Sequence, residues 1–234
     1  MAKRHLGSGA VLCLSAAMIA CSNNSDSYFP LSKEAHWEYK IVQKKGASDT
    51  VSQLDIETGG TVEVGAQIAS IRRASTGQFW AIVTDATGIT RVASRREVDD
   101  EFAADAEPRF VLKAPFTVGN NWSAPTVPYL LARSGEFPPE LIHAHKTSMT
   151  YTIASVSESI TTVAGSFTDC LRVDAVGVLR LYVDPVIGVT DVPLTGQEWY
   201  CKGVGLVKLT RIEKIASPFL TGGEYSMELT RFSF

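Results

Sequence analysis

Short runs rich in Val, Ile and Thr, separated by Gly, Asp and Asn, recur along almost the whole chain. Such runs form β-strands, because branched side chains pack well on a pleated sheet and turn residues interrupt the pattern. Residues 45–49 and 85–88 have the composition of tight turns and favour hairpins. The sequence therefore predicts a mainly β fold, with an antiparallel sheet that is curved or partly closed into a barrel to protect its edges. The predicted strands are 37–44, 50–57, 61–73, 79–84, 89–94, 109–113, 147–157, 167–175, 178–183, 197–202, 206–214 and 225–234.

One segment has a helical pattern instead. Residues 97–106 (EVDDEFAADA) place Val98 and Phe102 four positions apart, which predicts one short helix. The acidic residues here could collect calcium, but they lack the glycine and the alternating ligands of a calcium loop, so we interpret them as a solvated helix face. They are Asp99, Asp100, Glu101, Asp105 and Glu107.

The composition limits the classes of function. The chain has 234 residues, 45% of them hydrophobic, which suffices for a substantial core. Its 22 basic and 25 acidic residues leave no positive excess to hold a phosphate backbone, so we expect no nucleic-acid partner.

The N-terminus predicts export. Lys3 and Arg4 precede a short apolar run that ends at Ala20-Cys21, and residues 1–20 therefore indicate a signal peptide. The end of this run resembles the lipobox of bacterial lipoproteins, which implies that Cys21 is lipidated, typically with palmitate, and held at a membrane through acyl chains. Ser22 after the cysteine implies the outer membrane, and residues 21–27 then form the anchor and a polar tether. The alternative is a generic signal peptide with a chance cysteine.

Cysteine counting predicts one disulfide. Cys13 leaves with the signal peptide and Cys21 is the anchor, so only Cys170 and Cys201 remain in a compartment that permits disulfides. The apolar residues of 167–173 share one face of a predicted strand, and Cys170 would point away from that face. We therefore expect a Cys170–Cys201 bridge, and the alternative is two unpaired thiols.

A weak internal echo concerns the domain organisation. The pattern Pro-apolar-hydroxyl, four residues, Trp runs from Pro30 to Trp37 and again from Pro115 to Trp122. Each proline can end one segment while the tryptophan anchors the next in the core. The predicted organisation is a single β-rich domain, 28–234, or two similar halves, 28–113 and 114–234.

Three segments together resemble a family. They are similar to three motifs of a group of uncharacterised bacterial lipoproteins and secreted proteins. The motif FPLxxGxxWxY corresponds to Phe29-Pro30-Leu31 with Trp37-Glu38-Tyr39. The motif GxFxDCLxV corresponds to residues 163–173 (VAGSFTDCLRV), and WYAxGVGLV corresponds to residues 199–207 (WYCKGVGLV). The chain departs from the group at 33–35, which lack its glycine, and at Cys201, which replaces a small residue. The resemblance therefore implies neither the disulfide nor any activity.

Few residues point to chemistry. The sequence has no Gly-x-Ser-x-Gly, His-Glu-x-x-His, Cys-x-x-Cys, Walker or Ser-x-x-Lys motif. His143 and His145 would project to one side of an extended segment as a weak half-site for zinc, against the commoner case of unrelated surface histidines.

A proline-rich segment at 124–140 has the length of a lid or binding segment, or of a loop that caps an open end of the sheet. The residues that could contact a ligand or partner there are Tyr129, Leu130, Leu131 and Phe137.

These observations favour a noncatalytic protein of the cell envelope, which binds an apolar ligand or a protein partner or maintains the envelope. No cofactor is implied. The alternatives are a metal-dependent enzyme, since active-site residues can meet only in the fold, and a structural component of an envelope assembly.

Overall fold

The computed structural model describes residues 26–46, 48–133, 146–184, 186–215, 217 and 220–234, which form almost entirely β-structure. The predicted mainly β, antiparallel fold is therefore confirmed. The strands are β1 (His36–Lys45), β2 (Ser48–Val64), β3 (Gln67–Ala74), β4 (Gln78–Asp85), β5 (Gly88–Arg96), β6 (Ala103–Lys113), β7 (Asn121–Thr126), β8 (Ala132–Arg133), β9 (Thr147–Thr162), β10 (Gly165–Asp184), β11 (Gly188–Cys201), β12 (Gly205–Glu213), β13 (Leu220–Thr221) and β14 (Gly223–Ser233).

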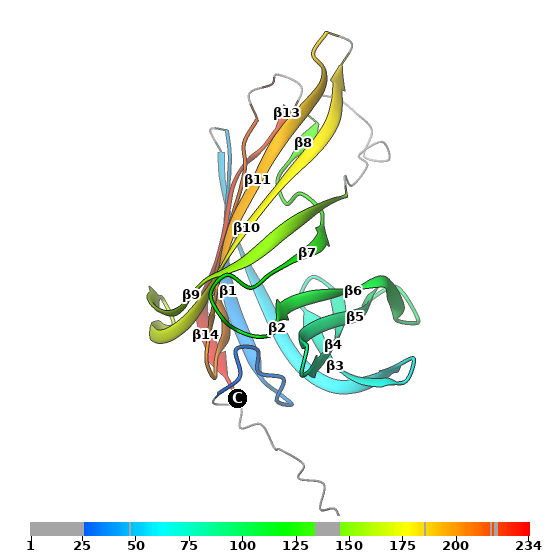
Figure 1. Ribbon diagram of the computed structural model, residues 1–234, viewed down its shortest axis with the longest axis vertical. Helices are drawn as coiled ribbons and strands as arrows, with labels where there is room; N and C mark the ends of the chain where they lie inside the picture. Colours follow the sequence, from blue (N-terminus) through cyan, green and yellow to red (C-terminus); the bar gives the residue numbers. More distant parts are fainter. Residues whose placement is uncertain (1–25, 47, 134–145, 185, 216, 218–219) are drawn as a thin grey trace, which may run out of the picture.

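The main sheet consists of two meanders. In the described residues, twelve strands pair in the order β6-β5-β4-β3-β2-β1-β14-β12-β11-β10-β9-β7, and β8 pairs with β13 separately. The first meander is β1 to β6, and the second runs from β7 to β14. The two are joined by β1 and β14, which pair antiparallel from His36–Ser233 to Lys45–Gly223. The first and last strands of the main sheet, β1 and β14, therefore lie side by side in the middle of the sheet. Strands β6 and β7, which come from the middle of the sequence, form its two edges (Figure 1).

The sheet curves until it is nearly closed into a barrel. The two edge strands β6 and β7 contact each other but share no ladder among the described pairs. Residues 114–120 join them, and the Asn120 amide holds this linker by donating to the carbonyl oxygens of Lys113 at 2.8 Å and Pro115 at 2.9 Å. The linker begins after residue 113, which is the boundary between the two similar halves considered from the sequence. We call the gap between β6 and β7 the seam.

The residues just before the first echoed segment contact the second echoed segment. Trp37 is buried and donates from Nε1 to the Val204 carbonyl at 2.7 Å, while buried Trp122 stacks on Tyr151 with ring centres 5.7 Å apart. Tyr28 and Phe116 make an edge-to-face contact at 5.6 Å. Both tryptophans therefore anchor their segments in the core.

The predicted helix at 97–106 is wrong. These residues form the turn after β5 and the start of β6. Val98 is 81% exposed, so it does not share a buried face with Phe102. Instead, Asp99 accepts the Arg96 backbone amide at 2.9 Å and closes the turn. After the turn, the chain runs antiparallel to β5 as strand β6. The four-residue spacing of Val98 and Phe102 does not reveal this pairing.

Several strands run further than their predicted limits. Residues 178–183 continue the strand predicted at 167–175 within β10, and β2 continues through a register shift between Thr58 and Thr61. The short strand β7 was not predicted, because its six residues include a proline.

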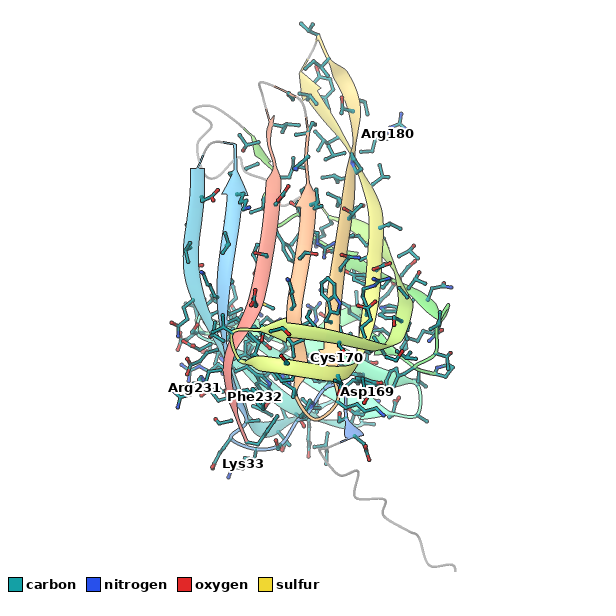
Figure 2. The ribbon with its side chains drawn as sticks, turned by 90° about the vertical axis from the view of Figure 1, so that its left-hand side faces the viewer. Lys33, Asp169, Cys170, Arg180, Arg231 and Phe232 are labelled. Atoms are coloured by element: carbon teal, nitrogen blue, oxygen red, sulfur yellow. A yellow bond between two sulfur atoms is a disulfide. The ribbon has the colours of Figure 1, made fainter. Side chains whose placement is uncertain are left out.

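The hairpin of β9 and β10 folds across the outer face of the sheet (Figure 2). The Ala164 amide donates to the Leu229 carbonyl at 3.2 Å, and the rings of Phe167 and Phe232 are 6.1 Å apart. Ile160, Ala164 and Phe167 of this hairpin pack against a second buried cluster, which includes Cys170 and Leu229. Within the described part of the chain, no helix is long and apolar enough to cross a membrane.

Candidate ligand-binding cavity

A half-open cavity of about 230 Å³ lies between the two meanders. It is larger than the roughly 150 Å³ that can hold a benzene ring, so it has room for an apolar group. Every strand of the first meander contributes to its wall, and the facing wall comes from the second. The lining residues are Phe29, Tyr39, Ile56, Arg72, Trp80, Ile82, Arg91, Arg109, Phe110, Val111, Tyr129, Tyr151, Glu198, Tyr200, Leu206 and Leu209.

Tyrosine rings form much of the apolar surface of the cavity. Tyr39 donates its hydroxyl to the Leu206 carbonyl at 2.8 Å, and Tyr200 donates to the Glu198 carboxylate at 2.6 Å. Burial raises the pKa of both phenols. Their hydroxyls are therefore tied to the wall, which leaves the rings as rigid surfaces for a ligand.

Arg72 is a cation built into the wall. Its guanidinium lies 3.7 Å from the centre of the Phe29 ring and 4.2 Å from that of Trp37, and it donates to the Pro30 carbonyl at 2.8 Å. Arg72 is only 5% exposed, and its Nε has no hydrogen-bond partner. Burial lowers its pKa to about 10, so it remains charged at neutral pH.

Two further arginines differ in their pairing. Arg91 makes a bidentate ion pair with Asp105, at 2.7 and 3.1 Å. Arg109 has only a long contact with the Tyr151 hydroxyl at 3.5 Å, and no described carboxylate lies within ion-pair distance of it. Arg109 is thus a half-buried cation without a counter-charge.

A second pocket, of about 460 Å³, lies at the seam. Residues 105–107 and Arg109 of β6 line it, and so do Pro125 and Thr126 of β7. Arg91 and Arg109 line both this seam pocket and the inner cavity. The two spaces are therefore neighbours, and Arg109 stands between them.

The structure places the proline-rich segment against the barrel. The buried Glu213 carboxylate accepts the backbone amides of Tyr129, Leu130 and Leu131 at 2.8 to 3.0 Å. Leu130 is buried in the core, while Tyr129 lines the cavity. Phe137 lies outside the described residues.

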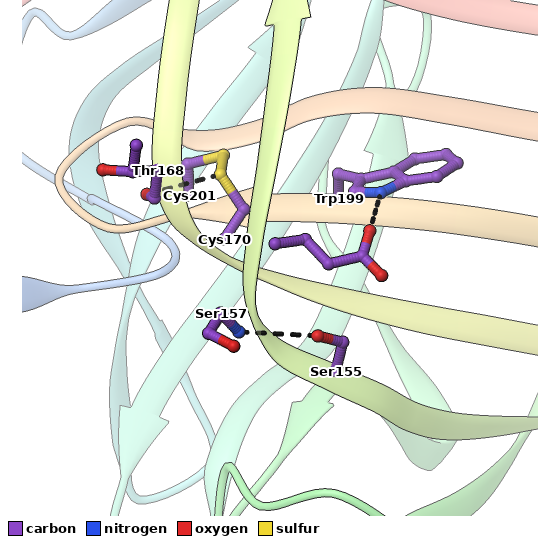
Figure 3. Close-up of a disulfide and its surroundings, with 7 residues drawn as sticks. Ser155, Ser157, Thr168, Cys170, Trp199 and Cys201 are labelled. Atoms are coloured by element: carbon purple, nitrogen blue, oxygen red, sulfur yellow. Dashed lines mark hydrogen bonds between the residues drawn. A yellow bond between two sulfur atoms is a disulfide. The ribbon is translucent and has the colours of Figure 1, made fainter.

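Cys170 and Cys201 form a disulfide between paired positions of β10 and β11 (Figure 3). Cys170 belongs to a different buried cluster from Leu171 and Val173, so it points away from their face as expected. Phe167 departs from the expected alternation and lies with the Cys170 cluster, because the pairing with β9 shifts register between them and Asp169 has a positive φ of 53°.

The remaining predicted sites are not brought together. Cys21, His143 and His145 lie outside the described residues. Within the described part, no group of three or more His, Cys, Asp or Glu side chains could hold a metal ion. Asp99 and Asp105 of the acidic segment each pair with an arginine instead.

Sequence reasoning missed the charged and aromatic lining of the cavity. Arg72, Arg109 and Glu198 occur in strands, where a charged side chain is normally read as facing water. The alternation of side chains along β11 could have indicated that Glu198 faces inward. Glu198 and Tyr200 lie on the same face of this strand as the buried Leu194.

Comparison with known proteins gives two structural likenesses. No protein-family model and no curated protein matches the chain. A "putative lipoprotein" from Parabacteroides distasonis is 15% identical with a TM-score of 0.44, covering 90% of this chain and all of that one. A "putative exported protein with YmcC-like fold" from Bacteroides fragilis is 12% identical with a TM-score of 0.41, covering 89% of this chain and all of that one. Both TM-scores are below 0.5, so neither likeness bears on the function of this chain.

Proposed function

We propose that this protein is a noncatalytic binding module of the bacterial cell envelope, which holds a small molecule with an apolar body inside its curved sheet. The observation that carries this proposal is the inner cavity of about 230 Å³, lined by rings of Tyr39, Tyr151 and Tyr200. Most small-molecule sites are largely apolar concavities with a few convergent polar groups. The inner cavity and the seam pocket together have the size of such a site, which is about 300–1,000 Å³.

The position in the cell follows from the N-terminus. Lipidation of Cys21 after removal of residues 1–20 would fix the protein to a membrane, and Ser22 favours the outer membrane. The mature chain would retain 20 basic and 25 acidic residues. Incorporation of labelled palmitate, lost in Cys21→Ser, tests this part of the proposal, and unchanged labelling of Cys21→Ser would contradict it.

Native mass spectrometry tests the binding role. The sample is the mature chain, residues 21–234 with Cys21→Ser, which keeps every described residue. We expect a bound apolar species, or a rise in melting temperature when lipids are added. A clean ligand-free protein whose melting does not respond to lipids would contradict the proposal.

A pair of variants on β2 locates the binding. Ile56→Trp adds volume at a residue that lines the cavity and should reduce the amount of bound species. Val51→Trp makes the larger change at an exposed residue of the same strand and should leave the bound species unchanged. Equal retention in both variants would place the ligand outside the cavity.

A further inference from the structure

The inner cavity carries more positive than negative charge. Arg91 is neutralised by Asp105, which leaves Arg72 and Arg109 against the single carboxylate of Glu198. Glu198 already accepts the Tyr200 hydroxyl, and it lies beyond ion-pair distance of both arginines. Buried cations in proteins are normally paired, because an isolated charge is costly in an apolar environment. Arg72 is buried and Arg109 half-buried, and neither has an anionic partner among the described residues.

Arg109 has the donors to bind an anion. A guanidinium carries five N–H donors, and the contact of Arg109 with the Tyr151 hydroxyl uses one of them, over the long distance of 3.5 Å. The planar fork of arginine matches the two oxygens of a carboxylate or phosphate. Because Arg109 lines both the inner cavity and the seam pocket, an anion bound to it can have its apolar body among the tyrosine rings.

The seam provides an entrance with the same charge preference. Exposed Lys146 and half-buried Arg109 line the seam pocket together with Glu107, while Arg91 and Asp105 neutralise each other. A positive cleft raises the local concentration of anions and favours their entry. β6 and β7 are the two sheet edges and have no ladder between them in the described chain, so separating them breaks no strand pairing.

We propose that the ligand is an amphiphilic oxyanion, which enters between β6 and β7 and is bound by the Arg109 guanidinium with its apolar body in the inner cavity. This inference rests on the proposed binding function and adds the chemical class of the ligand. The shared chemistry is a carboxylate or phosphate monoester on an apolar chain.

Three probes with the same apolar chain test this inference: sodium octanoate, octyl phosphate and 1-octanol. Binding to the mature chain with Cys21→Ser is measured by isothermal titration calorimetry. We expect at least one anion to bind about tenfold or more tightly than 1-octanol, as a hydrogen bond to a charged group would give. A stronger preference for octanoate assigns a carboxylate, and one for octyl phosphate assigns a phosphate.

Arg109→Gln is the critical variant, because it removes the charge without leaving a carboxylate unpaired. It should abolish the preference for the anions while binding of 1-octanol stays within about twofold. Arg180→Gln, on the exposed part of β10, is the matched control and should keep the preference. If Arg109→Gln does not melt as a folded protein, Arg109→Lys is used, which keeps the charge and should retain part of the preference.

The outcomes separate this inference from the proposed function. Equal binding of all three probes, or an anion preference that survives Arg109→Gln, overturns the anion assignment and leaves the apolar cavity as the binding site. No binding of any probe, together with a protein that carries no bound species, overturns the binding function itself.

Discussion

The guanidinium of Arg72 lies 3.7 Å from the centre of the Phe29 ring, so the segment before β1 is held against β3. The Trp37 ring lies on the same guanidinium at 4.2 Å. This arrangement gives a structural role to Phe29 and Trp37, which belong to the first motif of the resemblance.

Replacing Arg72 with Lys should destabilise the protein by about 2 kcal/mol, because an ammonium cannot stack between two rings as a planar guanidinium does. Urea denaturation measures the free energy of unfolding. The matched control is Arg73→Lys, at the next position of β3, where the exposed ion pairs with Glu57 and Glu97 predict a change below about 0.5 kcal/mol. Equal losses in both variants would contradict the role given to the ring contacts.

Replacing Glu213 with Gln should cost about 2–3 kcal/mol. The carboxylate is 1% exposed and accepts three consecutive backbone amides, whereas an amide side chain would turn one of its own donors toward them. We also expect faster proteolysis of the segment around Leu130. Glu224→Gln, which removes only an exposed contact with Lys214, is the control and should change stability little. A Glu213→Gln protein as stable as this control would refute the proposed anchoring.

Removing the disulfide should also lower stability. The double variant Cys170→Ala, Cys201→Ala opens a loop with a sequence separation of 31, which corresponds to roughly 3 kcal/mol in the chain-entropy description. Denaturation with and without reductant should give the same difference for the unmodified protein. Two alkylated thiols, found by mass spectrometry without reductant, would contradict the bridge.

The protein should lose stability above about pH 10. Burial raises the pKa of four tyrosines, Tyr39, Tyr129, Tyr200 and Tyr225, above the usual value near 10. Between the unfolded and folded pKa values, the folded state keeps protons that the unfolded state releases, so stability falls as pH rises. Arg72 acts in the opposite direction, since its pKa is lowered to about 10, but it is a single group. Tyrosinate absorbance should therefore rise in a second step that coincides with unfolding, and ionisation of all tyrosines near pH 10 in the folded protein would contradict this.

The sequence predicts the strands well because strand signals are local. Turn residues mark the β1–β2 and β4–β5 hairpins directly, whereas the run predicted as one strand at 61–73 contains the turn between β2 and β3. The pairing of β1 with β14 joins residues almost 200 positions apart, from His36 to Ser233, and no local pattern encodes it. The helix expected at 97–106 fails for the same reason, since the spacing of Val98 and Phe102 carries no information about the partner strand β5.

The cavity could not be predicted because the inward face is ambiguous. In β12, Val207 and Leu209 alternate in phase with Arg211 and Glu213, and all four are buried. Leu206 belongs to the other phase and yet lines the cavity as well, because the ladder between β11 and β12 shifts register between Trp199 and Tyr200. A bulge changes which phase faces inward, so strict alternation does not identify the interior there.

The most direct measurement is a crystal structure of the mature chain grown with sodium octanoate. We predict that the apolar chain lies among the rings of Tyr39, Tyr151 and Tyr200, with the carboxylate in hydrogen-bond contact with the Arg109 guanidinium at the seam. An empty inner cavity at a concentration that saturates binding in calorimetry, or octanoate bound only on the outer face of the sheet, would contradict the binding function proposed for this cavity.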